Sequence, residues 1–327
     1  MRVAVSGGAG FIGSHLVDAL VAEGSDVMVI DDLSHGSASN IVGAAGTGAS
    51  GSRVELVELD VRDGAGVHRA LTRFRPEVVF HLAAQIDVRT SMLDPATDAA
   101  VNVLGSVNVF AAALAAGARR VVNTSTGGAI YGETDLVPTP ETAPTDPLSA
   151  YGLGKHTVEQ YGAWFRRSHG LDVVTLRYGN VYGPRQDPRG DAGVIAIFCD
   201  RVLSGSRPTV FGDGTQTRDY VFVGDIVAAN LAAAGAVDLR HDLFNVGTGT
   251  EVDVLTLITA VAEAAGVDPV AFAPEFRPAR AGEVLRSCLD VSRARDELGL
   301  SAATGLTAGL RTTLEWVRTL TAAERTS

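Results

Sequence analysis

The sequence is poor in two features that would point to a metalloprotein, a secreted scaffold or a nucleic-acid-binding protein. It holds only 2 cysteines in 327 residues, Cys199 and Cys288, and their separation fits neither a disulfide framework nor a metal cluster. Basic side chains are outnumbered, because 27 Lys and Arg stand against 38 Asp and Glu, for a net charge of −11. A surface that neutralises many phosphates needs the opposite balance. We therefore expect no metal, no nucleic-acid partner and a reducing compartment.

Long apolar stretches are also missing. No run of 18 apolar residues occurs, and Met1-Arg2 leads directly into the short run Val3-Ala4-Val5 instead of the long apolar segment of a signal peptide. We expect a soluble, unprocessed cytoplasmic protein that does not associate with membranes.

Lysine is almost absent. Of the 27 basic side chains 26 are arginine, and Lys155 is the only lysine. An ammonium is a compact point charge, whereas a guanidinium is a planar fork with a different reach. The sequence therefore predicts a chemical requirement at position 155 that arginine does not meet.

The residues that are present follow an alternating pattern. Six short apolar runs rich in β-branched residues are expected to be strands, at 3–6, 27–31, 54–60, 78–82, 121–125 and 173–178. Segments of helical period lie between them, at 12–23, 64–74, 98–116 and 150–168. Buried strands that alternate with helices predict an α/β fold, a doubly wound parallel sheet of the Rossmann type.

The alternation ends after Tyr178, and a Pro- and Gly-rich stretch at 183–193 follows it. We therefore expect a dinucleotide-binding Rossmann domain over 1–180, with some later segments returning to it, and a smaller ligand-binding region over 181–327. Residues 36–52 are dominated by Gly, Ala, Ser and Thr, and we expect them to form a mobile surface loop.

A glycine-rich turn lies between the first expected strand and the first helix. Residues 7–13 read GGAGFIG and satisfy both GxGxxG and GxxGxxG. Such glycines let a pyrophosphate approach the free N–H groups of a helix N-terminus. Asp31-Asp32 closes the next strand, where a carboxylate can accept hydrogen bonds from a ribose and favours NAD over NADP. A turn or a helix cap is the alternative role for the two aspartates.

Two further patterns carry chemistry. Tyr151 and Lys155 are four residues apart, on one face of an expected helix, where the ammonium can stabilise a phenolate and lower the pKa of the tyrosine. Thr124-Ser125-Thr126 ends the fifth strand, at the edge where open α/β sheets bind ligands. The pattern predicts a tyrosine general base with a hydroxyl partner. A solvated ion pair and ordinary turn hydroxyls are the structural alternatives.

Together these motifs resemble the extended short-chain dehydrogenase/reductases, and among them the UDP-glucose 4-epimerase type. The likeness covers nearly the whole chain, and further motifs that carry it are His81-Leu82-Ala83-Ala84, Asn102, Arg177 to Pro184 (RYGNVYGP), Arg218-Asp219-Tyr220 and Arg280-Ala281-Gly282-Glu283. The resemblance implies that the NAD site is lined by Gly7, Gly10, Phe11, Ile12, Gly13, Asp31, Asp32, Ser34, Asp60, Val61, Leu82, Ala83, Ala84, Gln85, Asn102, Lys155 and Tyr178.

The resemblance also implies the catalytic and substrate residues. Tyr151 is the expected base with Lys155 beside it, and Thr126 is the expected catalytic hydroxyl, with Ser125 as an alternative. Counting back from Tyr131-Gly132 instead places the family's hydroxyl position on a glycine, Gly127, so we favour the count from the strand. The positions that match the UDP-sugar site are Thr126, Tyr151, Asn180, Val194, Thr209, Phe211, Arg218, Arg280 and Glu283.

The implied reaction is epimerisation at C4 of a UDP-hexose, UDP-glucose or UDP-galactose, through a 4-keto sugar formed with bound NAD. UDP-GlcNAc is an alternative substrate because the small Ser287 stands where many such enzymes carry tyrosine, and UDP-glucuronate is another because Arg185 or Arg189 could meet its carboxylate. A nucleotide-sugar dehydratase or decarboxylase is disfavoured, since Gly127-Gly128 follows Thr126 where those enzymes carry acidic residues. A non-catalytic NAD-binding regulator is the alternative from another class. The resemblance further implies a homodimer formed through the helices at 98–116 and 150–168.

Overall fold

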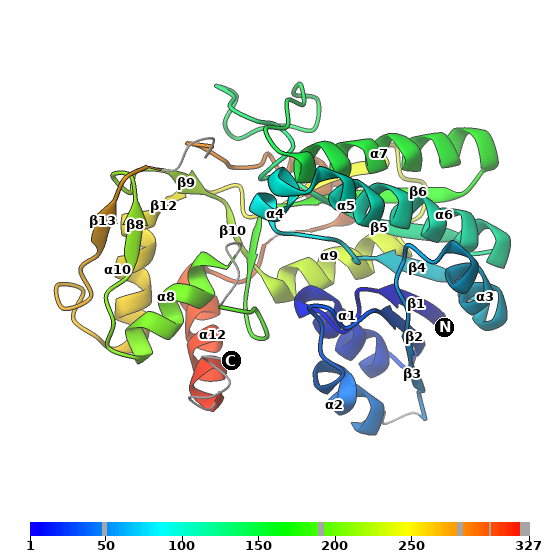
Figure 1. Cartoon of the computed structure of the whole chain (residues 1–327), viewed down its shortest axis with the longest axis horizontal. Coiled ribbons are helices and arrows are strands. Elements are labelled where there is room, and N and C mark those ends of the chain that lie inside the picture. The colour runs from blue at the N-terminus through cyan, green and yellow to red at the C-terminus, as the bar shows by residue number, and fades with distance from the viewer. Residues whose placement is uncertain (48–50, 189–192, 280–283, 301, 321–327) are drawn as a thin grey trace.

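A seven-stranded parallel sheet forms the centre of the molecule (Figure 1). The computed structural model describes residues 1–47, 51–188, 193–279, 284–300 and 302–320. The sheet has the strand order β11-β6-β5-β4-β1-β2-β3. Its strands are β1 (Arg2–Ser6), β2 (Asp26–Asp31), β3 (Val54–Glu58), β4 (Val78–His81), β5 (Arg120–Thr126), β6 (Asp172–Tyr178) and β11 (Leu243–Val246). The order reverses between β1 and β4, which places a ligand crevice outside the carboxyl ends of these strands.

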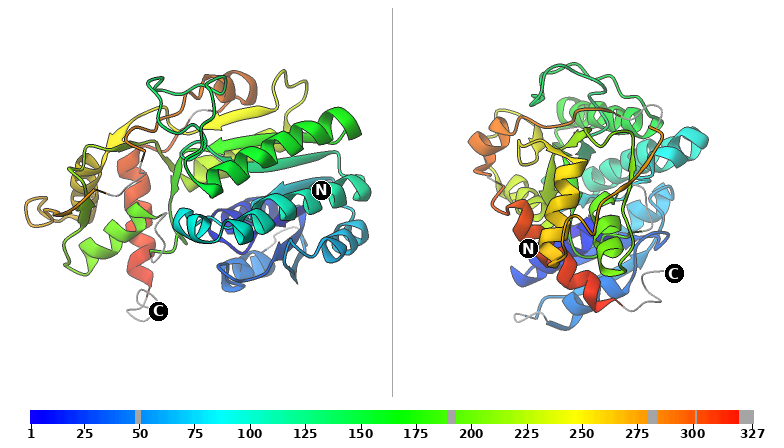
Figure 2. Two further views of the ribbon diagram at one scale, coloured as in Figure 1. Left: turned by 45° about the horizontal axis from the view of Figure 1, so that its top comes forward. Right: turned by 90° about the vertical axis from the view of Figure 1, so that its left-hand side faces the viewer.

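Helices cover both faces of the sheet, as the doubly wound pattern requires. One face carries α3 (Gly64–Phe74), α6 (Gly105–Ala116) and α7 (Ala150–His169), and the other carries α1 (Phe11–Ala22) and α9 (Val223–Gly235), with α2 (Ser39–Thr47) beside α1 and α11 (Ser292–Leu298) beside β11. Helices α6 and α7 lie side by side in the views of Figures 1 and 2. The expected α/β Rossmann architecture is confirmed.

Alternation along each strand separates two apolar cores. Val3 and Val5 on β1 pack with Leu16 and Leu20 of α1, whereas Ala4 between them packs on the opposite side, toward α3 and α6. All of these side chains are almost wholly buried. Because both faces are covered, the strands read as continuous apolar runs in the sequence.

The C-terminal half adds a separate cluster of helices and short strands, on the left of Figure 1. It contains α8 (Val194–Leu203), α10 (Val254–Ala265) and α12 (Leu306–Thr319), and the two-stranded pairs β7 (Asn180–Tyr182) with β10 (Tyr220–Phe222), β8 (Thr209–Phe211) with β13 (Glu275–Arg277), and β9 (Thr217–Arg218) with β12 (Val252–Asp253). Helices α8, α10 and α12 pack on one another around a third apolar core (Figure 2). Strand β11 and helix α9 return to the large sheet.

Two sequence expectations differ from the structure. The stretch 36–52 contains the helix α2, so the prediction of a loop throughout was wrong. Ile41 of this helix is buried in the same apolar core as α1 and holds α2 in place, which the composition of the segment does not reveal. The expected helix 98–116 lies within a longer helical run, Pro95–Ala116, in which a π-helical turn η1 (Ala100–Leu104) joins α5 (Pro95–Ala99) to α6; the short helix α4 (Val88–Leu93) precedes it.

One stretch has the length and apolar composition of a membrane span, Pro95–Ala116, and 44% of its most apolar window is buried inside the protein. Helix α6, which forms its second half, packs against α3 and α7. Its apolar character is therefore explained by its place in the core of the α/β fold.

Candidate active site

The glycine-rich turn forms a tight cradle at the start of α1. Gly7 has a φ of +72°, and a Cβ there would lie 2.6 Å from the Ala83 nitrogen. A Cβ at Gly13 would lie 2.1 Å from the Gly7 oxygen, so side chains are excluded at both positions. No side chain caps the N-terminus of α1. The result is a concave, side-chain-free surface of backbone at a helix N-terminus, which suits a pyrophosphate.

The two aspartates after β2 brace the turns around this cradle. Asp31 accepts hydrogen bonds from the Ala9 nitrogen at 2.9 Å and the Leu33 nitrogen at 2.9 Å. Asp32 accepts from the nitrogen and the hydroxyl of Ser34. The turn-forming alternative therefore describes part of their role. Each carboxylate has about four acceptor directions, so both can still accept a hydrogen bond from a ribose.

Tyr151, Lys155 and Thr126 come together where β5 ends against the first turns of α7. The Thr126 hydroxyl is hydrogen-bonded to Tyr151, and the Lys155 ammonium donates to the Thr124 oxygen at 2.9 Å. Lys155 is 5% exposed. Ser149 caps α7 by accepting from the Gly152 nitrogen, which fixes the first turn that carries Tyr151.

Burial moves both titratable groups away from their ordinary pKa values. The pKa of Tyr151 is raised to about 12, chiefly by burial and also by the charge of Asp98, while the Thr126 hydrogen bond opposes both. Burial lowers the pKa of Lys155 to about 8, while Asp98 and Glu159 oppose that change. The sequence argument predicted a lowered pKa for the tyrosine; in the protein without ligand the shift is upward, because desolvation dominates.

Ser125 points to the other side of β5. Its hydroxyl donates to Glu159 at 2.6 Å, and Glu159 also receives two hydrogen bonds from Arg177, at 2.8 and 2.6 Å. Arg177 in turn donates to the Tyr131 hydroxyl at 2.7 Å. The structure thus separates the two candidate hydroxyls: Thr126 faces Tyr151, and Ser125 belongs to a buried ion-pair network.

Asn102 lies in the π-helical turn, a distortion that often marks functional sites. Its amide and the backbone of Gln85 form a reciprocal pair of hydrogen bonds at 2.9 and 3.0 Å. Both side-chain amides also donate to Asp98 Oδ1, Gln85 at 2.9 Å and Asn102 at 3.0 Å. This cluster lies on the α7 side, next to the helix that carries Tyr151 and Lys155.

The other predicted cofactor positions surround the cradle or lie behind it. Leu82 and Ala83 pack directly against Gly7, and Ala84 follows them in the chain. Asp60 pairs with Arg62 at the end of β3, and Val61 is buried beside Gly105. Tyr178 uses its phenol inside the protein, 3.2 Å from the Thr124 hydroxyl and 3.0 Å from the Asn230 amide oxygen. The Tyr178 hydroxyl therefore makes its hydrogen bonds inside the protein core.

The predicted sugar-site residues lie on several elements, and two residues meet at the loop after Thr126. Asn180 and Ser287 both approach Gly128: a Cβ there would lie 3.5 Å from Asn180 Oδ1 and 4.0 Å from Ser287 Oγ. Thr209 and Phe211 are on β8, Val194 begins α8, and Arg218 is on β9. Arg280 and Glu283 lie outside the described residues, as does Arg189.

Arg185 has a partner within the protein. It pairs with Asp18 of α1 at 2.7 Å, beside His15, whose ring nitrogen contacts the Pro184 oxygen at 2.9 Å. These contacts join the glycine-rich helix to the segment after β7. The suggestion that Arg185 receives a sugar carboxylate finds no support in this geometry.

Comparison with known proteins identifies the family to which this site belongs. Residues 3–247 match the model of the NAD dependent epimerase/dehydratase family. The UDP-glucose 4-epimerase of Mycolicibacterium smegmatis is 46% identical over 97% of this chain and 99% of that protein. The chain belongs to the NAD dependent epimerase/dehydratase family.

Solved structures of similar proteins agree over nearly the whole length. A UDP-glucose 4-epimerase from Thermotoga maritima, determined with UDP-glucose, has a TM-score of 0.91 and 42% identity, covering 97% of this chain and 99% of that one. A UDP-glucose 4-epimerase from Thermus thermophilus, in complex with NAD, has a TM-score of 0.89 and 41% identity, covering 98% of this chain and 100% of that one.

The cradle fits the dinucleotide that gives the epimerase/dehydratase family its name. The test is steric: at Gly7 and Gly13 a single Cβ would collide with backbone, so the chain keeps a surface that a bound pyrophosphate can approach closely. The predicted cofactor, NAD, is thus confirmed by the family and agrees with the shape of the turn.

Three residues that the structure places around the site were not predicted from the sequence: Asp98, Glu159 and Arg177. Glu159 extends the spacing of Tyr151 and Lys155 by another four residues, so helical periodicity alone would have placed it on their stripe. Asp98 stands four residues before Asn102, a spacing that predicts contact on a helix. Nothing local signals that Arg177, on β6, reaches the same helix.

Proposed function

We propose that this protein is a UDP-glucose 4-epimerase, an isomerase that interconverts UDP-glucose and UDP-galactose with retained NAD. The observation that carries the proposal is the meeting of Thr126, Tyr151 and Lys155 at the carboxyl edge of the sheet, beside the glycine cradle. A binding protein without catalysis has no need to bury its only lysine beside a tyrosine that contacts a threonine hydroxyl.

The residues of the site have separate roles in the proposed reaction. Tyr151 accepts the proton of the sugar 4-hydroxyl and later returns it, and Thr126 holds that hydroxyl by sharing its own proton. NAD, when bound, supplies reversible acceptance of the hydride from C4. Lys155 offsets the negative charge of the phenolate. The closed site retains the keto sugar until the hydride returns to its opposite face.

We assign the catalytic hydroxyl to Thr126 and not to Ser125. The Ser125 hydroxyl already donates to Glu159 at 2.6 Å, further along α7 than Tyr151. Thr126 is the hydroxyl that contacts the phenol.

We assign NAD binding to residues 1–180 together with α9 and β11, and nucleotide-sugar binding mainly to 181–327. The NAD contacts are those predicted from the sequence, from Gly7 to Tyr178. In the sugar site, Asn180 and Ser287 lie nearest the loop after Thr126, and Arg218 can clamp a phosphate with its forked donors. We expect the reaction to take place in the cytoplasm.

The same loop disfavours a dehydratase or decarboxylase. Those reactions are expected to use an acidic side chain directly after the catalytic hydroxyl, and this chain has Gly127 and Gly128 there. A Cβ at Gly127 would lie 2.5 Å from the far end of the Leu289 side chain, so a longer residue there would have to displace Leu289. The elimination step therefore lacks its acid in this site.

An N-acetylated sugar is a second candidate substrate. Ser287 and Gly128 are both small and lie close together, which leaves space beside Asn180 for a bulkier C2 substituent. UDP-GlcNAc turnover by the wild type, lost in Ser287→Tyr while UDP-glucose turnover remains, would support this assignment. If the wild type leaves UDP-GlcNAc unchanged, the N-acetylated sugar is not a substrate, and the assignment of the hexose reaction is unaffected.

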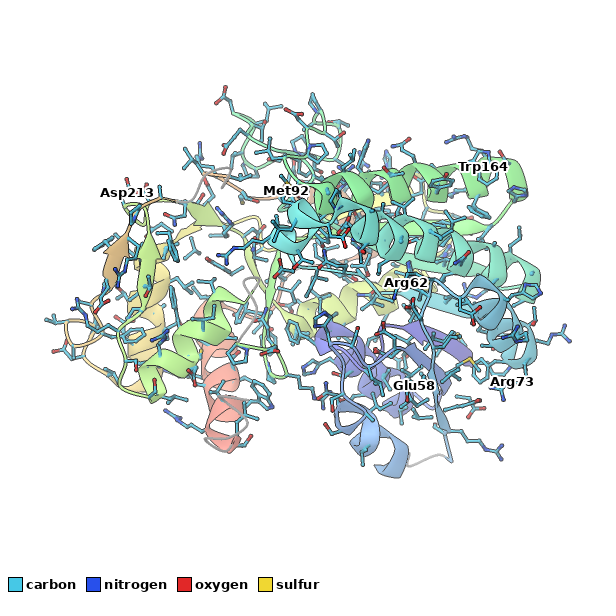
Figure 3. All side chains as sticks on the ribbon, in the orientation of Figure 1. Glu58, Arg62, Arg73, Met92, Trp164 and Asp213 are labelled. Atoms are coloured by element: carbon cyan, nitrogen blue, oxygen red, sulfur yellow. The ribbon has the colours of Figure 1, made fainter. Side chains whose placement is uncertain are left out.

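A homodimer completes the proposal. Apolar side chains are exposed along the outer faces of η1 and α7: Leu104 is 51% exposed, Leu153 56% and Trp164 44%. In Figure 3, Trp164 and Met92 lie along the upper edge formed by α7 and α4. Two copies of α6 and α7 can pack these faces as a four-helix bundle.

Light scattering tests the dimer directly. We expect twice the chain mass for the wild type and the monomer mass for Leu104→Glu with Trp164→Glu. Arg311→Glu, on the distant α12, is the control for a changed surface charge and should remain dimeric. A monomeric wild type at micromolar concentration would contradict this part.

The decisive experiment incubates purified protein with a panel of UDP-sugars and no added reductant, followed by separation of the epimers. Interconversion of UDP-glucose and UDP-galactose is expected, and Tyr151→Phe should reduce the rate by about 10²- to 10⁴-fold. Unchanged activity of Tyr151→Phe would defeat the assignment of the base. Oxidised sugar released in proportion to added NAD would indicate a dehydrogenase instead.

A further inference from the structure

Asp98 is a buried carboxylate next to the catalytic helix that the proposed reaction does not use. It lies on α5 and is 2% exposed. Its Oδ1 accepts hydrogen bonds from Gln85 Nε2 at 2.9 Å and Asn102 Nδ2 at 3.0 Å. Its Oδ2 faces α7, where a Cβ at Gly154 would lie 3.2 Å away. The absence of a side chain at Gly154 thus lets the carboxylate approach the helix between Tyr151 and Lys155.

The charge on Asp98 is held by amides and not by a cation in contact. Among the described residues no Arg or Lys lies within ion-pair distance of it. Its field reaches both catalytic groups, favouring the charged form of Lys155 and disfavouring that of Tyr151. Burial raises the pKa of Asp98, and the two amides and Lys155 oppose that rise.

The other groups near the pair contribute less free charge. His81 on β4 is neutral, because burial lowers its pKa to about 3, and its ring joins the hydroxyls of Ser6 and Ser106. Glu159 on α7 is paired with Arg177, and its charge acts on Lys155 and not on Tyr151. From β5 the pair meets only the hydroxyl of Thr126 and the carbonyl of Thr124. In the described part of the chain, Asp98 is therefore the one carboxylate without a cation in contact that acts on both groups.

We infer that Asp98 is a positioning residue with two linked roles: it fixes the Gln85 and Asn102 amides on the cofactor side, and it sets the proton balance of Tyr151 and Lys155. The inference rests on the proposed epimerase function for its catalytic meaning. A carboxylate here holds Lys155 protonated when the site is loaded and keeps Tyr151 protonated until a second positive charge, that of the oxidised nicotinamide, is present. Base strength is thereby linked to occupancy of the cofactor site.

The substitution Asp98→Asn tests the charge while keeping the shape. The pKa of Tyr151 and that of Lys155 both fall when the negative charge is removed, so both limbs of the kcat/KM profile should move to lower pH, by about one unit. Asp98→Ser, which is neutral and smaller, should move them the same way. Asp98→Glu keeps the charge and should leave the limbs near their wild-type positions.

A readout without turnover makes the inference independent of substrate. Ultraviolet titration of phenolate, taken as the difference between each protein and its Tyr151→Phe counterpart, reports Tyr151 alone. We expect Asp98→Asn to lower that midpoint by about one unit in the protein freed of NAD. Asp94→Asn is the matched control, because Asp94 is exposed, caps the same helix and leaves the midpoint unchanged.

The two readouts distinguish the possible failures. A lower kcat in Asp98→Asn, with both pH limbs and the phenolate midpoint unmoved, would overturn the proton-balance role and leave Asp98 a structural residue. A shifted phenolate midpoint in a protein that epimerises no UDP-sugar would leave the inference standing and defeat the proposed function.

Discussion

Two neighbouring clusters along α7 carry the same kinds of groups in opposite arrangements. In the first, the ion-pair cluster, Ser125, Glu159 and Arg177 form a closed network, in which carboxylate and guanidinium share two hydrogen bonds. In the second, the catalytic cluster, Tyr151 and Lys155 of the same helix lie with Thr126 near Asp98, without a direct ion pair to it. The side chains of both clusters are buried or half-buried.

The difference shows how one fold separates stability from chemistry. The charge of Glu159 is matched within contact distance by Arg177, so removing either partner leaves an unpaired charge. The charges of the catalytic cluster are matched only at longer range, so each affects the protonation of its neighbours. Mutations in the two clusters should therefore fail in different ways.

The largest expected effect is in the catalytic cluster. Lys155→Met should lower kcat by about 10²- to 10⁴-fold, because no cation then stabilises the phenolate. Lys155→Arg should fail similarly, since a planar guanidinium does not fit a site that leaves 5% of the lysine exposed. Steady-state rates of the three proteins check this; a Lys155→Arg variant with normal turnover would refute the requirement for an ammonium.

The next effect belongs to the ion-pair cluster and should appear in unfolding. Arg177→Met leaves the buried Glu159 unpaired, so the free energy of unfolding should fall by about 3–5 kcal/mol. Replacing Glu159 and Arg177 together with methionine should recover much of that loss. Denaturant unfolding of the wild type, both single variants and the double variant measures the coupling, and additive losses would contradict the closed-pair description.

A direct comparison between the two clusters distinguishes the two hydroxyls. Thr126→Val should lower kcat by about 10²-fold with little change in unfolding. Ser125→Ala should cost about 1 kcal/mol of stability and leave kcat near the wild-type value. Rates and unfolding of both variants decide the matter; a larger loss of kcat in Ser125→Ala than in Thr126→Val would reverse our assignment.

The last effect is the pH dependence of stability, which changes no side chain. The pKa of Lys155 is about 8 in the folded protein and 10.5 ordinarily, so the unfolded chain binds more protons between these values. Stability contributed by this residue should therefore rise with pH from about 8 to 10.5, by about 3 kcal/mol in all. Lys155→Met shares every other titrating group with the wild type, so the difference in free energy of unfolding between the two proteins reports Lys155 alone. A difference that does not change with pH would contradict the buried position of Lys155.

How much of this structure can be predicted from the sequence depends on how far apart along the chain the interacting residues are. The strands, the helices of the first half and the glycine turn follow from local patterns, so α3 and α7 lie within a residue of their predicted bounds. Tyr151 and Lys155 are brought together by their four-residue separation on a helix, which can be read directly from the sequence.

The remainder depends on contacts between distant segments. Helix α2 follows a turn that Asp31 braces from the strand before it, and its Ile41 packs on α1. Ser125 and Thr126 are adjacent in the chain, so no spacing argument separates them; the alternation of β5 and the position of Arg177 do so. The upward shift of the Tyr151 pKa likewise comes from burial, which the spacing of two residues cannot reveal.

The scarcity of lysine gives the protein a built-in spectroscopic probe. Because the chain has a single ε-amino group, and that group donates to the Thr124 carbonyl inside the site, a sample grown with ¹⁵N-labelled lysine yields one side-chain amine resonance. That resonance would follow ligand binding, pH and each substitution around Asp98 without assignment of any other signal.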